Sequence, residues 1–400
     1  MRYKNLLISS VIGLIGMILY FVTIPTIDQD QMVQLTVEAG DEALLDDLII
    51  GGYLYTYSSF LYTKDGVSIY EETPYLEKLD LADDIHTATL QATYPDFAND
   101  FIFDYSTYTK GLLTSDDYLI SAQFKLGHQY SPNLDKLNVK ILDKNTNTVK
   151  EEVISRSNFP TGSVVEFMGM YQEYPKLKFL LNTYSWENSA DGFTSHLSIL
   201  EYNVETKVVS EEIIHEFVGA YYPHDYSWVY KNQRLNLLSV EENNYVTEGQ
   251  TLMHLFNFEN NSFEPIDGPM VDNLFVSDEG VLYSYDITND EMTLTQHDEN
   301  TFEAVKETTI VTSEDSATIS QDDYFVSVTM VSDNKFYFAK SEFLDYDDLG
   351  SQTIKPSHLF IFDIETGEEL LYAKVNYDLE NYRFSNEASI ESIGLLSNYK

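Results

Sequence analysis

The stretch that decides the fold is His358–Val375, HLFIFDIETGEELLYAKV. Apolar and polar side chains alternate before and after the central DIETGE, as they do in strands with one buried face. Asp, Thr and Gly suit the tight turn between two antiparallel strands, because they tolerate turn geometry and bond the local backbone. The sequence therefore predicts a β-hairpin here.

Four further stretches repeat this pattern of strand, polar turn and strand. They are Leu137–Val153, His196–Ile213, Thr251–Ile266 and Met292–Val305. The five hairpins begin 41 to 66 residues apart, and strand-like stretches precede each, for example Tyr118–Phe124 and Lys176–Tyr184. A unit of about four strands that recurs at such intervals is typical of a β-propeller blade.

In this pattern the chain resembles the bacterial membrane-anchored β-propeller proteins with WD40-like or quinoprotein-like repeats. The turn Asp363–Glu368 carries the resemblance, because its D-x-x-T-G form is frequent in such blades. No Trp-Asp pair recurs, and only Trp186 and Trp228 are present, so the resemblance is one of pattern.

The resemblance implies an all-β fold with a six- or seven-bladed β-propeller, counting a first unit around Gly52–Leu81. Ala388–Leu396 is expected to close the ring with an early strand, because an open sheet edge invites aggregation. A short helix is expected within Glu38–Leu48. The alternative architecture is two β-sandwich domains, which the same short strands allow.

The N-terminal segment predicts one transmembrane helix. Leu6–Ile24, LLISSVIGLIGMILYFVTI, runs for 19 residues without a charge, and Arg2 and Lys4 precede it. At 1.5 Å per residue the run spans about 28 Å, close to the hydrocarbon thickness. The positive-inside rule places the N-terminus in the cytoplasm and the remaining chain outside. The alternative is a cleaved signal peptide, but no small-x-small cleavage site follows the run.

The expected organisation is a cytoplasmic stub and anchor over residues 1–27, a stalk over residues 28–44, and an extracytoplasmic propeller over residues 45–400. Two of the 23 basic residues precede residue 25 and all 66 acidic residues follow it, so the outer part carries a net charge of −45. Nucleic acid is a polyanion bound through Lys and Arg, so no nucleic-acid partner is expected. A chain without cysteine excludes disulfides and thiolate chemistry, and it fits an exported protein on the cell membrane of a Gram-positive bacterium.

Two stretches are candidates for ligand binding. Asp345, Asp347 and Asp348 lie beside Gly350 and offer clustered oxygens for calcium, the one cofactor that we consider. Tyr222, His224 and Trp228 concentrate aromatic and polar groups that suit a ligand surface. The alternative for the second stretch is a packing strand between blades with a turn at Pro223.

The function that these features favour is a binding or accessory module without catalysis, which presents a propeller to a protein, peptide or envelope ligand. A fold alone does not give a function, because propellers host both binding proteins and enzymes. The alternative is an extracytoplasmic propeller enzyme, a glycan or lactone hydrolase or lyase, with its site at the central funnel. A third hypothesis is a sensor or assembly factor beside a membrane complex.

Overall fold

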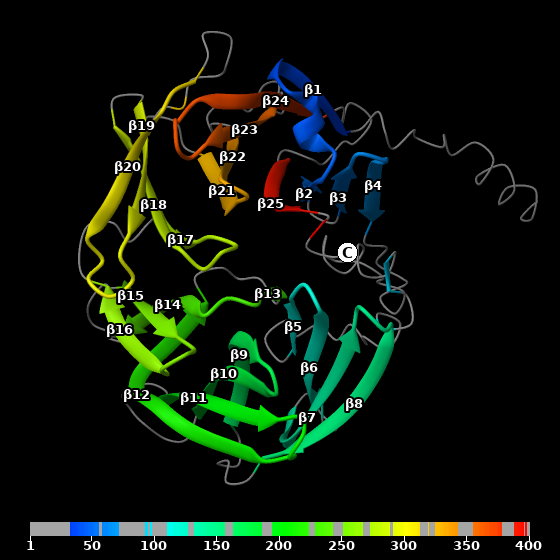
Figure 1. Cartoon of the computed structure of the whole chain (residues 1–400), viewed down its shortest axis with the longest axis vertical. Coiled ribbons are helices and arrows are strands. Elements are labelled where there is room, and N and C mark those ends of the chain that lie inside the picture. The colour runs from blue at the N-terminus through cyan, green and yellow to red at the C-terminus, as the bar shows by residue number, and fades with distance from the viewer. Residues whose placement is uncertain are drawn as a thin grey trace, which may run out of the picture.

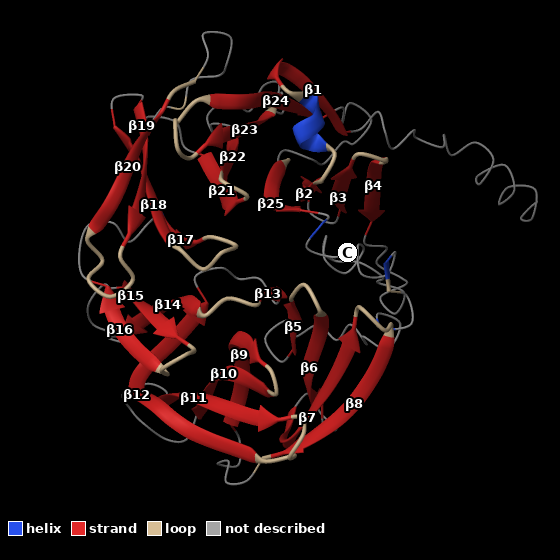
Figure 2. Ribbon diagram, viewed as in Figure 1, coloured by secondary structure: helices blue, strands red, loops and turns tan. Residues whose placement is uncertain are grey.

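The computed structural model of the chain is a ring of β-sheets (Figure 1). It describes residues 33–55, 58–71, 93–94, 97, 110–126, 132–156, 163–185, 194–223, 229–242, 251–266, 273–288, 291–312, 319, 325–342, 355–377, 388–395 and 397. Strands account for nearly all the described regular structure, and Figure 2 shows a short helix beside strand β1. That helix is the 3-10 turn Glu42–Leu45, η1, which lies within the stretch where a short helix was expected.

Six blades of four core strands each make up the ring, so the fold is a six-bladed β-propeller. Within each blade, the strands are given in order from the innermost to the outermost. Blade 1 contains β25 (Ser389–Leu395), β2 (Leu48–Tyr55), β3 (Ser58–Thr63) and β4 (Gly66–Glu71). Blade 2 contains β5 (Lys110–Thr114), β6 (Tyr118–Leu126), β7 (Pro132–Asp143) and β8 (Thr148–Ser155). Blade 3 contains β9 (Ser163–Glu173), β10 (Lys176–Ser185), β11 (Thr194–Asn203) and the first part of β12 (Val209–Pro223).

Strand β12 belongs to two blades, which explains why blades 3 and 4 form one seven-stranded sheet. Its residues 209–218 pair with β11 and its residues 219–223 pair with β14. Blade 4 therefore contains the end of β12, β14 (Leu235–Glu242), β15 (Thr251–Asn257) and β16 (Ser262–Ile266). Blade 5 contains β17 (Leu274–Val276), β18 (Leu282–Thr288), β19 (Glu291–His297) and β20 (Ala304–Ile310). Blade 6 contains β21 (Phe325–Ser332), β22 (Lys335–Glu342), β23 (Ser357–Asp363) and β24 (Glu369–Tyr377).

The five predicted hairpins are confirmed as the two outer strands of blades 2 to 6. They correspond to β7–β8, β11–β12, β15–β16, β19–β20 and β23–β24. Each hairpin turn begins with Asp or Asn, whose side chain accepts a hydrogen bond from the amide two residues later. The fifth turn residue has a left-handed backbone in every case; these residues are Asn147, Lys207, Asn261, Phe302 and Gly367. The turns thus share one geometry, a short loop closed by a left-handed residue.

Two strands from opposite ends of the chain close the ring. β25 pairs antiparallel with β2, which confirms the closing strand predicted from residues 388–396. β1 (Val33–Gly40) pairs antiparallel with β24 as a fifth, outermost strand of blade 6. The stalk predicted over residues 28–44 is therefore corrected from residue 33 onward, where the alternating side chains of VQLTVEAG pair with the edge of a sheet.

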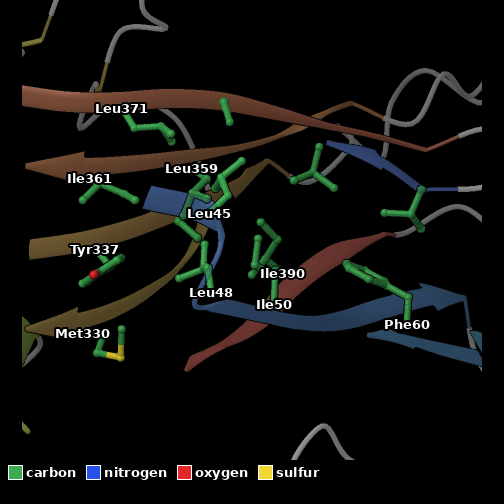
Figure 3. Packing of buried hydrophobic residues seen from close by; sticks show 14 of the residues in the cluster. Leu45, Leu48, Ile50, Phe60, Met330, Tyr337, Leu359, Ile361, Leu371 and Ile390 are labelled. Carbon is green, nitrogen blue, oxygen red and sulfur yellow. The ribbon is translucent and has the colours of Figure 1, made fainter. Parts of the chain in front are cut away.

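The hydrophobic core lies between the blades, not around the central axis. Five clusters of buried side chains each join two neighbouring blades. The cluster between blades 6 and 1 combines Leu359 and Leu371 with Ile50, Phe60 and Ile390 (Figure 3). Each such side chain contributes about 1.5–3 kcal/mol when it is fully buried. Because these residues come from both blades, this cluster exists only when the ring is closed.

Cations of one blade hold the hairpin turn of the next blade. Lys178 of blade 3 donates hydrogen bonds to Phe258 O and to Asn261 Oδ1, the latter at 3.1 Å. Arg234 of blade 4 forms a bidentate ion pair with Glu299, and Lys306 of blade 5 contacts Glu365 at 2.6 Å. In a chain with only 23 basic residues, several are thus committed to the seams between blades.

The predicted transmembrane helix, Leu6–Ile24, falls outside the described residues. Within residues 33–397 as described, no helix combines the length and the apolar character needed to cross a bilayer. The anchor and the signal-peptide alternative therefore both stay predictions.

The seam between blades 5 and 6 depends on Gly367. A Cβ atom at this position would lie 2.0 Å from Thr309 O of β20, and the residue has φ +75°. The substitution Gly367→Ala should lower the free energy of unfolding by more than about 2 kcal/mol, because it adds a steric clash to the strain of a left-handed alanine. Denaturation by urea measures this loss.

The matched control is Asn147→Ala, at the same turn position of blade 2, where the side chain is exposed and φ is 52°. It carries the backbone strain without the clash, so it should lose only about 1 kcal/mol. Equal losses in the two variants would mean that the contact between the blades contributes nothing.

Candidate functional site

The two faces of the ring differ in the length of their connections. On one face, here called the turn face, short turns join the two outer strands of every blade and the two inner strands of blades 2, 3, 5 and 6, such as 333–334 and 364–368. The opposite face, here called the loop face, carries the connections between middle strands and between blades. These range from two residues, 56–57, to the 38 residues of 72–109. Propellers and other rigid scaffolds carry binding residues on such variable loops.

The calcium candidates belong to the loop face by their place in the chain. Asp345, Asp347 and Asp348 lie in the connection between β22 and β23, which leaves and re-enters blade 6 at that face. All three lie outside the described residues, so their geometry stays a prediction. Among the residues that the structure does describe, no three Asp, Glu or His side chains are grouped as metal ligands.

The aromatic candidates belong to the inner rim of the ring. Tyr222 lies in the part of β12 that forms the innermost strand of blade 4, where its backbone pairs with Ser239. This placement agrees with the alternative of a strand that links two blades. The side chain of Tyr222 and the residues His224 and Trp228 fall outside the described part, so their predicted role as a ligand surface is not decided.

The chain after Trp228 runs along the centre of the ring. β13 (Val229–Lys231) pairs parallel with β5, the innermost strand of blade 2, and Figure 1 shows it near the middle of the ring. Because β5 leads into the turn Ser115–Asp117, β13 also runs toward the turn face. The Asn232 amide then continues the pairing by donating to Thr114 O at 3.0 Å.

Residues 232–234 cross from blade to blade at the turn face. The Asn232 side chain accepts from Gln172 N at 2.7 Å and donates to Gln172 O at 3.1 Å, so its amide imitates a strand partner for blade 3. Gln233 donates to Ser277 O of blade 5, and Arg234 binds Glu299 of the same blade. This crossing segment, which leads into β14 of blade 4, therefore also joins blades 2, 3 and 5 at the turn face.

A buried ion pair lies between blades 2 and 3. Arg156 follows β8, its side chain is fully buried, and its guanidinium forms a bidentate contact with Glu211 of β12. The same guanidinium lies 5.2 Å from the centre of the Phe124 ring. Burial lowers the pKa of Arg156, and the hydrogen bond and charge of Glu211 oppose that effect. The arrangement joins two blades and keeps the cation away from solvent, so it is structural.

A second group of buried polar side chains lies between blades 5 and 6. Tyr285 Oη lies 2.6 Å from Ser327 Oγ, and His358 Nδ1 lies 3.0 Å from Tyr372 Oη. Lys340, which is only 1% exposed, lies on the strand between Ser327 and His358. Burial raises the pKa of Tyr285, so its phenol stays protonated. The ring of His358 also stacks on Tyr372, so this histidine packs within the blade.

Sequence analysis did not identify the crossing segment. Its three polar residues, Asn232, Gln233 and Arg234, interrupt two apolar stretches, but a polar triplet between strands reads as an ordinary turn. Nothing local signals that their partners are at residues 114, 172, 277 and 299, because those contacts depend on the whole ring.

Replacing Asn232 tests the crossing segment. Asn232→Ala should lower the free energy of unfolding by about 1–2 kcal/mol, because it leaves the N–H and C=O groups of Gln172 without their partner. Asn300→Ala is the control, since Asn300 is exposed on the same face and its backbone N–H, not its side chain, donates to the Asp298 carboxylate. Urea denaturation should separate the two variants, and an equally small loss in both would show that the crossing segment does not brace the ring.

Comparison with known proteins assigns neither a family nor a function to the chain. No protein-family model matches the chain, and no curated protein matches it. Among solved structures, TolB from Acinetobacter baumannii is similar at 11% identity, with 88% of this chain and 67% of TolB covered and a TM-score of 0.33. The polysaccharide lyase Uly1 is similar at 10% identity, with 67% and 57% covered and a TM-score of 0.38.

Cobalt-substituted apocarotenoid oxygenase from Synechocystis is similar at 8% identity, with 90% of this chain and 60% of that chain covered and a TM-score of 0.29. The chain thus spans about 57–67% of the length of these three proteins. Scores this low transfer no activity, and the number of blades rests on the pairing of the strands themselves. By that pairing the chain is a six-bladed β-propeller protein.

Proposed function

We propose that this chain is a membrane-anchored, extracytoplasmic binding module that presents its loop face to a protein, peptide or envelope ligand. The observation that carries the proposal is the difference between the two faces. On the turn face, cations of the preceding blade contact the hairpin turns of blades 4, 5 and 6, and residues 232–234 cross this face. The loop face collects the long connections, including the one that holds the predicted site residues Asp345, Asp347 and Asp348.

The charge of the chain supports a location outside the cell and limits the ligand. All acidic residues follow the apolar segment Leu6–Ile24, and basic residues precede it. A net charge of −45 on the outer part attracts cationic partners and repels anionic polymers and anionic lipid. A protein or peptide with a basic surface therefore fits the module better than a nucleic acid.

The lack of cysteine makes a direct test simple, because each engineered cysteine is then the single thiol of the chain. We expect a membrane-impermeant maleimide to label Asp347→Cys and Asn300→Cys in intact cells, and to label Lys4→Cys only after permeabilisation. Labelling of Lys4→Cys in intact cells, with no labelling of the other two, would show that the orientation is reversed.

The same variants test binding. With a ligand on the loop face, Asp347→Cys should react several-fold more slowly in cells than in the purified protein. Asn300→Cys, exposed on the turn face, should react equally fast in both. Equal rates at both positions would contradict a ligand on the loop face, and stable turnover of added glycans or lactones by the purified protein would favour the enzyme alternative.

Calcium at Asp345, Asp347 and Asp348 is a separate proposal within this function. If these carboxylates form a site, calcium at 100 times its Kd should stabilise the folded protein by about 2.7 kcal/mol. Calorimetric titration and thermal melts of the detergent-solubilised chain measure this, with Asp347→Asn expected to abolish the effect. Asp116→Asn, an exposed acid of the turn face, is the control. Absence of heat and of a thermal shift in the unsubstituted protein would reject the site.

A further inference from the structure

The direction of strand β1 fixes which face of the ring the N-terminal segment leaves. β1 begins at Val33, which pairs with Tyr377 at the end of β24, and it ends at Gly40, which pairs with Leu371. β24 starts from the hairpin turn at Asp363–Gly367 on the turn face and therefore ends at the loop face. Tyr377 Oη also donates to Ser357 Oγ at 2.7 Å, and Ser357 begins β23 on that face.

The opposite end of the folded chain lies on the other face. β25 runs from the loop face toward the turn face, because Ser389 pairs with Tyr53 and Leu395 pairs with Leu48 at the start of β2. Ser397 then donates to the Asp47 carboxylate. The chain thus enters the ring at the loop face of blade 6 and leaves it at the turn face of blade 1.

The connection to the apolar segment is short. Nine residue steps separate Ile24 from Val33, so a fully extended chain reaches about 30–32 Å. With the turn face against the membrane, this tether would have to pass the length of β1, about 25 Å, and the headgroup layer, about 6 Å. That path uses the whole reach of a taut chain, whereas with the loop face toward the membrane the tether has only the headgroup layer to pass.

From this geometry we propose that the loop face is turned toward the membrane and binds the extracytoplasmic part of an integral membrane protein with a basic surface. The inference rests on the proposed function, since it takes Leu6–Ile24 as the anchor. It adds the side of the ring that meets the membrane and the class of partner that reaches it.

Charge at this face selects a protein partner over the lipid itself. Exposed acids lie at the loop face. Glu216 is near the loop-face end of the pairing between β11 and β12, and Glu291 starts β19. Asp286 is exposed two residues before Thr288, the last residue of β18. The outer part of the chain carries −45 in total. Anionic lipid headgroups repel such a surface, while basic loops of a membrane protein attract it within the Debye length, about 10 Å at 0.1 M salt.

The orientation can be measured on the full chain in proteoliposomes without any partner. Two pairs of single-cysteine variants each compare the two faces within one blade: Ser155→Cys with Asn145→Cys in blade 2, and Thr288→Cys with Asn300→Cys in blade 5. All four residues are exposed. Energy transfer from a dye on each cysteine to an acceptor in the bilayer should place the first member of each pair about 20–25 Å closer to the membrane.

A variant with twelve Gly and Ser residues inserted after Ile27 is the control. Its longer tether removes the restraint, so the difference between the members of each pair should shrink. If both turn-face positions prove closer to the bilayer in the protein with the original tether, the proposed orientation is wrong, although the anchor is still supported. If the chain does not enter proteoliposomes at all, the anchor itself fails, and with it the proposed function.

The partner class is tested with a photoreactive maleimide on the same four cysteines in native membranes. We expect adducts from Ser155→Cys and Thr288→Cys that stay in the membrane after an alkaline wash, and far fewer of them at 1 M salt, where the Debye length is about 3 Å. Adducts only with proteins that the wash removes, adducts from the turn-face positions alone, or no adducts from any position would each overturn the integral membrane partner.

Discussion

Pairing between β25 and β2 is the interaction on which the rest of the ring depends. Each blade buries its side chains against the next blade, so a blade at an open end has nothing to cover one of its faces. The seam between blades 6 and 1 contains Ile50, Phe60, Leu359, Leu371 and Ile390, and departure of β25 would remove Ile390 from this cluster and open the cluster to water. β1 strengthens the same seam from the outside, because Val33 joins this cluster while its strand pairs with β24. A free edge in a sheet of this kind is also a template for aggregation.

Electrostatics at the other seams follows from the hairpin turns. In blades 4, 5 and 6, the turn that begins with Asp or Asn places one or two of its residues where a cation of the preceding blade can reach them, as with Lys306 and Glu365. Amide N–H groups of Thr366 and Glu365 hold the pKa of Asp363 below its usual range, so this carboxylate remains an acceptor. In the closed ring, burial and the nearby Asp333 raise the pKa of Tyr337 to about 12. Several of the few cations thus lie at the seams, where they neutralise acids or bind carbonyl groups of the next blade.

The sequence predicts those elements whose pattern lies within a short stretch of chain. Five hairpins and the closing strand could be predicted, because the alternation of apolar and polar side chains and the turn residues, as in Asp363–Gly367, lie close together in the sequence. The number of blades stayed open between six and seven, since β12 serves two blades. β1 was assigned to a stalk although VQLTVEAG alternates, because its partner β24 lies more than 300 residues away. The same reason hid the crossing segment at Asn232–Arg234. The candidate site residues were chosen by composition alone, and connections between strands have no period from which the mutual geometry of their side chains follows.

Closure by a late strand also has a consequence for the order of assembly. Pairing of Leu48 with Leu395 is among the most distant contacts that this chain can make, and contacts of that range form slowly. Blades 2 to 5 consist of neighbouring hairpins and can assemble as soon as their own residues are available. Blade 1 cannot, because its innermost strand is synthesised last. During synthesis the nascent chain is therefore an incomplete ring with an exposed β2 edge. A chain that is released before residue 389 keeps this open edge, which can pair with other chains and aggregate.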